Sequence, residues 1–253
     1  MYAEERQGEI ARRARTAGRV DVAELALDLD VSPETVRRDL TALERSGVLR
    51  RVHGGAIPAE RMRHEPALAV RAGEHTAEKR RIAQAALAEV EGASTVLLDA
   101  GSTTAMLAEL LPVGRDLVVV TNSVPIAMSL ASRTDLTLHL LGGRVRQRTL
   151  ATVDAAALEA LAELCVDVAF LGTNGVSVER GFTTADPAEA AVKRAMVHAA
   201  RRAVVLADAS KVGDDQLARF AVPADVETVV LDAAVDPRFA ADLEAAGPTV
   251  VLA

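Results

Sequence analysis

The sequence predicts an α/β protein of two domains, a small helical domain followed by a larger one built on a doubly wound, largely parallel sheet. Residues 3–58 contain short amphipathic helices and end in a pair of short strands. Residues 77–253 alternate apolar strands with amphipathic helices of roughly 10–15 residues, the pattern of a parallel sheet covered on both faces. Residues 59–76 lack periodicity and contain Pro66 and Gly73, so we expect a linker there.

Charge is distributed unevenly along the 253 residues. The formal net charge of the chain is −7, but residues 1–64 carry +1 and the remainder carries −8. The electrostatic footprint of a nucleic-acid reader belongs to one domain and not to the whole chain. The acidic total therefore does not exclude a DNA-binding domain at the N-terminus.

The composition indicates neither a membrane protein nor a secreted one. The apolar runs are far shorter than the roughly 18 residues that a membrane span needs. The first thirty residues contain many charged side chains, which excludes a secretory hydrophobic segment. Cys165 is the single cysteine, fits a reducing compartment, and precedes an apolar strand, where we expect a buried small hydrophobe. We expect a cytoplasmic protein without membrane contact.

A helix-turn-helix is predicted near the N-terminus. Apolar residues recur at helical spacing in Glu4–Thr16 and again in Val22–Leu29. The next helix has Ser32 as a good N-cap and Pro33 at its first position, and Gly47 suits its C-terminal end. These start and stop signals predict two short helices joined by a tight turn.

The last of these helices has one apolar and one basic face. Val36, Leu40 and Leu43 recur at i, i+4 and i+7 and point inward, while Glu34 complements the positive end of the helix dipole. A basic helix after a tight turn is typical of the element that enters the major groove of DNA. A small helical bundle with solvated arginines is the alternative for this segment. The outward side chains are Thr35, Arg37, Arg38 and Thr41.

A β wing is predicted directly after the helices. Residues 48–56 have the pattern of two short strands around a turn. Arg50, Arg51 and His53 of this wing are suited to contact phosphates or the minor groove. The wing strengthens the expectation of DNA binding.

The run from Ser32 to Leu40, followed by Arg51-Val52-His53-Gly54-Gly55-Ala56, resembles the DeoR family of bacterial transcription regulators. In that family the matching helix enters the major groove and the His-Gly-Gly segment lies in the wing. The resemblance implies that the outward residues of the helix contact bases and phosphates, whereas Asp39 orients an arginine or caps the helix locally. The predicted DNA-binding residues are Ser32, Pro33, Glu34, Thr35, Arg37, Arg38, Arg50, Arg51, His53 and Gly54.

Seven strands are predicted in the second domain. Helical patterns separate most of them, so we expect the strands to run parallel, with ligands bound at their carboxyl ends. The predicted strands are Thr95–Asp99, Leu117–Thr121, Leu136–Leu141, Val166–Leu171, Ala203–Asp208, Thr228–Leu231 and Thr249–Leu252.

Polar residues and glycines gather where these strands end. After the first strand, Asp99 to Thr104 opens a helix, where Gly101 permits close backbone approach and the hydroxyl and N–H groups suit a phosphate. One such segment alone is an ordinary strand-to-helix turn, but five at equivalent ends indicate a ligand site. The other four are Thr121-Asn122-Ser123, Gly142-Gly143-Arg144, Gly172-Thr173-Asn174-Gly175 and Asp208-Ala209-Ser210-Lys211.

Lysine is rare in this arginine-rich chain. Only Lys79, Lys193 and Lys211 are lysines among 29 basic residues, which suggests positions where a compact ammonium is needed. Lys211 directly follows a strand end and is the strongest candidate for a phosphate ligand. Lys193 lies four residues after Glu189, so it is either half of a surface ion pair or an ammonium that reaches the same sheet edge.

The segment from Lys79 to Ala253 resembles the DeoR sensor domain, whose fold is related to ribose-5-phosphate isomerase and CoA-transferase subunits. In the family, the matching elements surround a phosphorylated sugar, and a subgroup is associated with fructose utilisation. This chain departs from the family at Val153-Asp154-Ala155, where we expect Val-Gly-Pro, and that departure leaves the identity of the sugar open. The predicted effector-binding residues are Asp99, Gly101, Ser102, Thr103, Thr104, Thr121, Asn122, Gly142, Gly143, Thr173, Lys193, Asp208 and Lys211.

The expected function is that of a transcription regulator, a repressor of a carbohydrate-utilisation operon that a phosphorylated sugar releases from its double-stranded operator. We expect a dimer or tetramer, because helix-turn-helix proteins bind paired half-sites. We expect no enzyme activity and no cofactor, since the sequence has no nucleophile elbow, P-loop or dinucleotide fingerprint. We expect no metal site, since the histidines are scattered without metal-ligand spacing. The alternatives are a sugar-phosphate isomerase-like enzyme with an N-terminal appendage and a constitutive architectural DNA-binding protein.

Overall fold

The computed structural model describes residues 3–46, 48–52, 54–58 and 65–253. The chain divides into two compact units, with the boundary between Glu65 and Pro66. Helix α4 (Leu68–Gly73) lies inside the segment 59–76 that we predicted as linker, and it belongs to the second unit. Tertiary contacts explain the difference, because the Leu68 N–H donates to the Arg148 carbonyl, a long-range bond that periodicity does not reveal.

The N-terminal unit confirms the predicted helices and wing. Their apolar faces form one core that includes Ile10, Leu25 and Leu40. The strand order is β1-β3-β2, so a short strand before α2 extends the wing on one side, which the sequence did not predict. The elements are α1 (Ala3–Ala17), β1 (Val20–Asp21), α2 (Val22–Asp28), α3 (Pro33–Arg45), β2 (Leu49–Val52) and β3 (Gly55–Pro58).

The start of α3 has the predicted cap. The Ser32 hydroxyl accepts a hydrogen bond from the Thr35 N–H at 3.1 Å, and Pro33 occupies the first helical position. Such a cap stabilises a helix by about 1 kcal/mol, because it satisfies a backbone donor that has no partner within the helix. Ser46 caps the other end. The Gly47 expected there lies outside the described residues.

Two glycines shape the wing. Gly54 adopts a positive φ of 75°, which side-chain-bearing residues rarely adopt. Gly55 lies so close to β1 that an added Cβ would lie 1.9 Å from the Val20 carbonyl oxygen. The Gly-Gly pair of the wing is therefore required both by the turn and by the close approach of β1 and β3.

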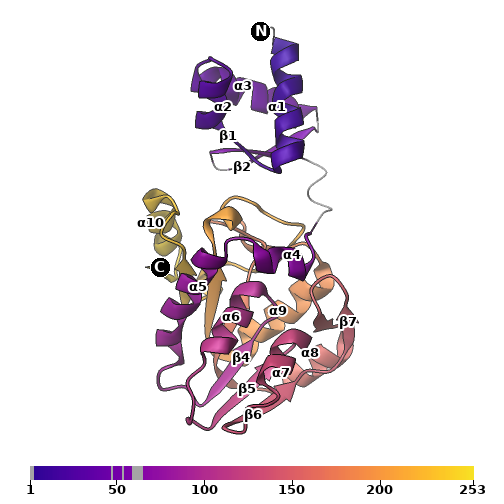
Figure 1. Cartoon of the computed structure of the whole chain (residues 1–253), viewed down its shortest axis with the longest axis vertical. Coiled ribbons are helices and arrows are strands. Elements are labelled where there is room, and N and C mark those ends of the chain that lie inside the picture. Colours follow the sequence, from indigo (N-terminus) through magenta and orange to yellow (C-terminus); the bar gives the residue numbers. More distant parts are fainter. Residues whose placement is uncertain (1–2, 47, 53, 59–64) are drawn as a thin grey trace. The chain divides into compact units, whose positions relative to one another are not determined.

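The second unit is built on the predicted seven-stranded sheet (Figure 1), in which every neighbouring pair is parallel. The strand order is β15-β14-β12-β9-β4-β5-β6. Strands β5 and β6 therefore follow β4 on one side of the sheet, and β12, β14 and β15 follow β9 on the other side. The strands are β4 (Thr95–Leu98), β5 (Leu117–Thr121), β6 (Leu136–Leu140), β9 (Val166–Gly172), β12 (Ala200–Ala207), β14 (Thr228–Leu231) and β15 (Thr249–Leu252).

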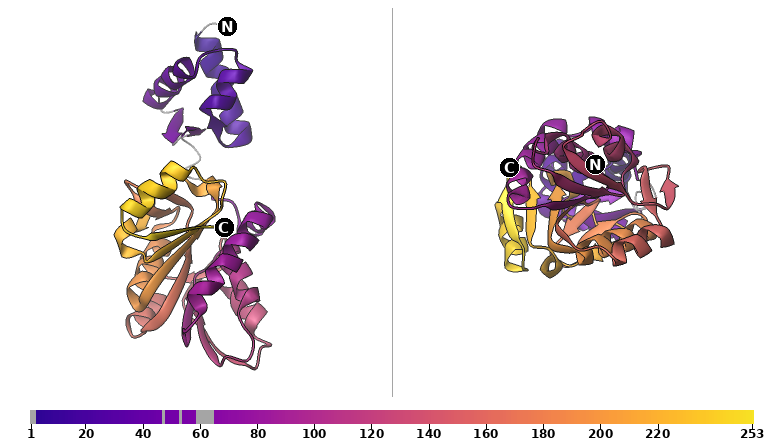
Figure 2. Two further views of the ribbon diagram at one scale, coloured as in Figure 1. Left: turned by 90° about the vertical axis from the view of Figure 1, so that its left-hand side faces the viewer. Right: turned by 90° about the horizontal axis from the view of Figure 1, so that it is seen from below.

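Helices cover both faces of the sheet (Figures 1 and 2). Neighbouring residues of β4 point to opposite faces, and accordingly Leu97 belongs to one apolar cluster and Leu98 to another. The Leu98 cluster is completed by α5 (Thr76–Ala86), η2 (Leu87–Val90), α6 (Ser102–Leu110) and α7 (Val124–Leu130). The Leu97 cluster is completed by α8 (Ala155–Ala162), α9 (Pro187–Ala199) and α10 (Pro237–Ala245).

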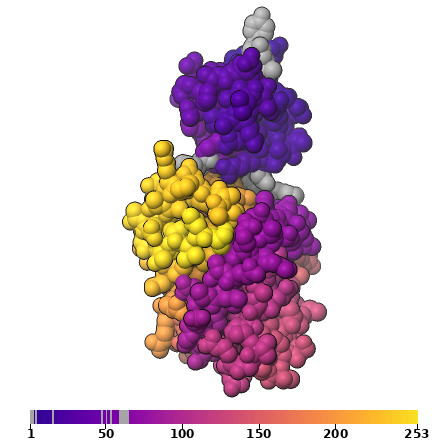
Figure 3. Space-filling view, turned by 60° about the vertical axis from the view of Figure 1, so that its left-hand side comes forward, coloured from indigo at the N-terminus to yellow at the C-terminus, as the bar shows by residue number. Residues whose placement is uncertain are grey.

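The beginning and the end of the second unit meet on its surface. In the space-filling view (Figure 3), the purple atoms from the early part of this unit and the yellow C-terminal atoms lie side by side. Arg81 of α5 approaches Asp232, which follows β14, to within 3.7 Å.

In the described ranges, no helix combines the length and apolar character that crossing a membrane requires.

Smaller elements complete the second unit, and the sequence did not predict them. They comprise an antiparallel sheet of three short strands, one hairpin and two 3-10 turns. Short strands carry too few residues for a clear period, so their pairing depends on neighbours distant in sequence. They are β7 (Arg144–Arg146), β8 (Ala151–Val153), β10 (Gly175–Ser177), β11 (Gly181–Thr184), β13 (Ala218–Ala221), η3 (Ala209–Lys211) and η4 (Pro223–Asp225).

Candidate functional site

The predicted reading face of α3 is exposed. Arg37 and Arg38 are both solvent-exposed, and Arg37 makes a weak contact of 3.3 Å with Glu34 one turn earlier. Arg51 of the wing donates to the Thr41 hydroxyl of α3 at 3.2 Å. Arg51 of the wing therefore lies beside α3. The side chain of Arg50 and all of His53 lie outside what the structure describes.

Asp39 has the orienting role that we expected. Its buried carboxylate accepts hydrogen bonds from Arg6 Nε at 2.5 Å and from Gln7 Nε2 at 3.0 Å. The hydrogen bond to Asp39 raises the pKa of the Arg6 guanidinium, although burial opposes this. Asp39 thus fastens α3 to α1.

A pocket lies near β4 and β9, the two strands between which the strand order along the sheet changes direction. It opens at the carboxyl ends of β4, β9 and β12, which is the place where doubly wound sheets bind ligands. Seven of the predicted effector-binding residues line it: Gly101, Ser102, Thr103, Thr173, Lys193, Asp208 and Lys211.

The remaining predicted residues do not line this pocket, and three of them support its walls. Thr104 donates to the Gly101 carbonyl, and Thr121 donates to the Leu98 carbonyl. The Asn122 side-chain oxygen accepts from the Ala100 N–H at 2.9 Å. Gly142 and Gly143 lie in the connection between β6 and β7, and Asp99 lies below the pocket floor.

One wall of the pocket is cationic. Arg71, Lys79 and Lys211 line it together with the N-terminal turn of α6, whose free N–H groups favour an anion. The buried Lys79 ammonium donates to the carbonyls of Arg71 and Glu74, so it also holds the end of α4. Burial lowers the pKa of Lys79, and the charges of Lys211 and Arg71 lower it further.

Asp208 is a carboxylate within this cationic wall. Burial by itself raises the pKa of Asp208, but the Lys211 ammonium and the hydrogen bond from Ser210 outweigh that effect and hold the pKa below its usual value. His75 and Lys79 also lower the pKa of Asp208. The wall therefore carries more positive than negative charge and suits a phosphate.

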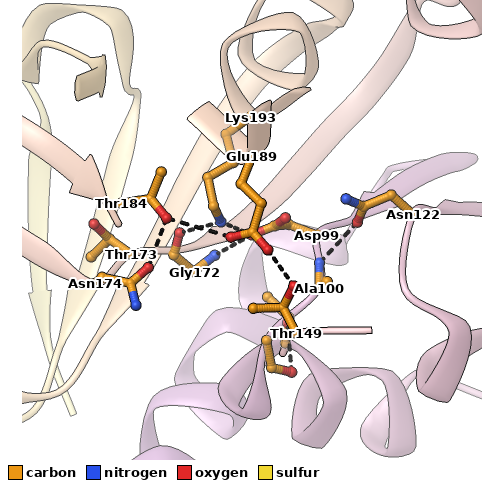
Figure 4. A network of polar contacts seen from close by, with 12 residues as sticks. Asp99, Ala100, Asn122, Thr149, Gly172, Thr173, Asn174, Thr184, Glu189 and Lys193 are labelled. Carbon is orange, nitrogen blue, oxygen red and sulfur yellow. Dashed lines mark hydrogen bonds and ion pairs between the residues drawn. The ribbon is translucent and has the colours of Figure 1, made fainter. Parts of the chain in front are cut away.

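Lys193 and Glu189 do not form the surface pair that was one of our two expectations. Both side chains are buried, with residue exposures of 4% and 5%. Lys193 is bonded to Asp99 and to the Gly172 carbonyl (Figure 4). The register of α9 explains the difference, because it directs this face of the helix toward β4 and β9 and away from solvent.

Glu189 belongs to a polar network that the sequence did not reveal (Figure 4). Its carboxylate accepts hydrogen bonds from Thr149 and from Arg146 at 3.2 Å, both in the β7–β8 hairpin. Glu189 and Asn174 also line the pocket. Arg71 and Lys79 were likewise missed as lining residues, although the rarity of lysine was a usable signal for Lys79.

Two further expectations concern cysteine and histidine. Cys165 is exposed and not buried as we expected, because it lies in the connection between α8 and β9 and not in the strand. Within the described residues, no group of three or more His, Cys, Asp and Glu side chains could hold a metal ion.

These two units together define a class of protein: a sequence-specific DNA-binding transcription regulator with a ligand-sensing domain. The model of the DeoR-like helix-turn-helix domain matches residues 6–61, and that of the DeoR C terminal sensor domain matches residues 74–233. The chain belongs to the DeoR family.

Several relatives cover most of the chain. It is 39% identical to the uncharacterized HTH-type transcriptional regulator FruR of Bacillus subtilis strain 168. This match extends over 214 residues and covers 85% of each chain. It is 34% identical over 251 residues to the HTH-type transcriptional regulator GlpR of Haloferax volcanii, covering 99% of this chain and 98% of that one. It is 29% identical over 237 residues, 92% of each chain, to the glycerol-3-phosphate regulon repressor of Escherichia coli K12. Among solved structures, ribose 5-phosphate isomerase A from Methanocaldococcus jannaschii matches 55% of each chain with 19% identity and a TM-score of 0.38.

Proposed function

We propose that this protein represses a carbohydrate-utilisation operon and leaves its operator when a phosphorylated sugar binds the pocket of the second unit. The observation that carries the proposal is the cationic wall, where Arg71, Lys79 and Lys211 meet the N-terminal turn of α6. A helix N-terminus with adjacent ammonium groups favours a phosphate over an uncharged sugar.

Other residues that line the pocket offer hydrogen-bonding groups that suit the hydroxyls of a sugar. Glu189 and Asn174 offer a carboxylate and an amide, groups that form hydrogen bonds with hydroxyls. A ligand with a phosphate at one end and hydroxyls at the other would satisfy both parts of the pocket. A relative named as the glycerol-3-phosphate regulon repressor supports a ligand of this chemical class.

A regulator accounts for the whole chain better than an isomerase-like enzyme does. An isomerase has no use for a capped basic helix with an arginine-bearing wing, and both parts of the chain match one regulator family. We also propose that the protein acts as a dimer or a larger oligomer. One winged helix contacts only a few base pairs, and pairing two of them lets the spacing of half-sites add specificity.

Lys211 provides the decisive experiment. Lys211→Ala should bind operator DNA as the wild type does, while phosphorylated sugars should no longer release it. Arg201→Ala is the control, because this exposed arginine lies at the start of β12, at the opposite end of that strand. Release is measured by fluorescence anisotropy with glucose 6-phosphate, fructose 1-phosphate, fructose 6-phosphate and glycerol 3-phosphate, and with the unphosphorylated sugars.

The outcomes separate the alternatives. A true effector at about 100 times its Kd should stabilise the wild type by about 2.7 kcal/mol in a thermal-shift measurement, whereas bare sugars should not. Release of Lys211→Ala at the wild-type effector concentration would move the effector site away from this pocket. Turnover of a sugar phosphate that slows in the variant would favour the isomerase-like alternative.

A further inference from the structure

The β7–β8 hairpin connects the pocket to the first helix of the sensor unit. On one side, Thr149 and Arg146 bond the Glu189 carboxylate, which lines the pocket. On the other side, the Arg148 carbonyl accepts a 2.9 Å hydrogen bond from the Leu68 N–H at the start of α4. Three residues within 146–149 of the hairpin therefore contact either the pocket-lining Glu189 or the segment that follows the domain boundary.

The same hairpin contains backbone strain. Leu150 and Asp154, which flank β8, have positive φ values of 55° and 74°. Left-handed backbone is unfavourable for residues with a side chain, and it persists where surrounding contacts impose it. Here the Leu150 carbonyl accepts from the Val124 N–H at 3.1 Å, and Asp154 pairs with Arg144 at 2.7 Å. Backbone strain of this kind can be released by a local change of conformation when a contact that imposes it is lost.

We propose that the β7–β8 hairpin transmits occupancy of the pocket to residues 66–73, where the sensor unit continues from the DNA-binding unit. This inference rests on the proposed function, because it takes the ligand to lie against Glu189. A sugar hydroxyl that donates to Glu189 competes with Thr149 and Arg146 for the same carboxylate oxygens. The hairpin then relaxes, and the Arg148 carbonyl no longer holds the start of α4.

The ends of α4 are tied to the pocket by different groups, which allows the hairpin to be tested separately. Lys79 holds the C-terminal end through the Arg71 and Glu74 carbonyls. The hairpin holds the N-terminal end through the Leu68 N–H. A change that removes only the Leu68 N–H therefore leaves the lysines of the cationic wall in place.

Leu68→Pro makes that change with little effect on the helix. Leu68 is the first residue of α4, a position that favours proline because its N–H has no partner within the helix. Ala67 has φ −57° and ψ 152°, the extended conformation that a residue before proline prefers. Leu68→Ala is the matched control, since it shortens the side chain but keeps the N–H.

The test measures operator affinity of the full-length protein with and without a phosphorylated sugar from the panel that releases the wild type. Both variants should still bind that sugar phosphate. Without ligand, Leu68→Ala should bind the operator within about twofold of the wild type, whereas Leu68→Pro, which already lacks the bond that the ligand breaks, should bind it about tenfold more weakly. The ligand should weaken operator binding by Leu68→Ala as it does for wild type, whereas in Leu68→Pro this effect should fall by about tenfold, within the usual range of such couplings. Equal release of the two variants would overturn the proposal.

Hydrogen exchange of the wild type gives an independent readout that needs no variant to fold. Adding the same sugar phosphate should change exchange in residues 144–153 and in residues 66–73 together. A ligand that alters exchange in the hairpin and leaves 66–73 unchanged would contradict the coupling while leaving the effector site intact. If no sugar phosphate of the panel binds or releases the wild type, the proposed function fails, and the coupling fails with it.

Discussion

Lys193, which lines the pocket, and Asp99 form a buried ion pair although they lie 94 positions apart in the sequence. Lys193 comes from α9 and Asp99 from the end of β4, and both also bond Gly172 at the end of β9. The Lys193 ammonium lies 5.4 Å from the centre of the Phe220 ring, which adds a cation–π contact. The pair therefore fastens two neighbouring strands and one helix at the point where the pocket opens.

Breaking this ion pair should destabilise the sensor unit strongly. Lys193→Met and Asp99→Asn each leave a buried group without its charged partner, which costs about 3–5 kcal/mol. The double variant should lose less than the sum of the two, because it contains no uncompensated charge. Urea denaturation of all four proteins completes the cycle, and strictly additive losses would show that the two side chains do not stabilise each other.

Removing the arginines of α3 should weaken operator binding without unfolding the protein. Arg37→Ala and Arg38→Ala should each cost about 1–3 kcal/mol if the side chain reads a base, and should flatten the salt dependence if it contacts a phosphate. Arg12→Ala removes an exposed arginine from α1 and serves as the control for charge loss. Unchanged operator affinity of the Arg37/Arg38 double variant, titrated at fixed salt, would refute α3 as the reading helix.

The cap of α3 gives a prediction about stability alone. Ser32→Ala should lower the free energy of unfolding of the N-terminal unit by about 1 kcal/mol, because the Thr35 N–H loses its acceptor. Ser32→Asp should preserve that stability, since its carboxylate accepts the same bond and favours the positive helix end. Thermal unfolding followed by circular dichroism distinguishes them. Equal melting of Ser32→Ala and the wild type would argue against a stabilising cap.

Acid should lower the free energy of unfolding of the sensor unit, in part because Asp208 becomes protonated. The pKa of this carboxyl lies below its ordinary value of 3.8, so the unfolded chain binds the proton more readily than the folded one. The resulting stability is fully present above pH 3.8 and is lost as the pH falls through the folded pKa. Asp208→Asn lacks this contribution, so the stability margin of wild type over variant should shrink below about pH 4. Urea denaturation between pH 3 and 7 measures the margin, and a constant margin would contradict the prediction.

Local sequence patterns were sufficient to predict most of the main helices and strands of this protein. The N-cap at Ser32, the apolar spacing of Val36 and Leu40, and the seven apolar strands depend on neighbours a few residues away, so their positions follow from the sequence. The position of the pocket at the carboxyl ends was predictable for the same reason, since parallel strands gather their ends at one edge. Lys211 and Asp208 do line the pocket.

The tertiary structure decided which groups meet across long distances in sequence. Lys193 pairs with Asp99 and not with Glu189, and Glu189 bonds Thr149, 40 residues away. Helical spacing allowed a Glu189–Lys193 pair, but the energy of burying a charge depends on every partner within reach, and α9 brings those partners from other strands. Arg71 shows the same limit, because α4 has too few residues for a clear period, and its N-terminal end is held by the Arg148 carbonyl, far away in the sequence.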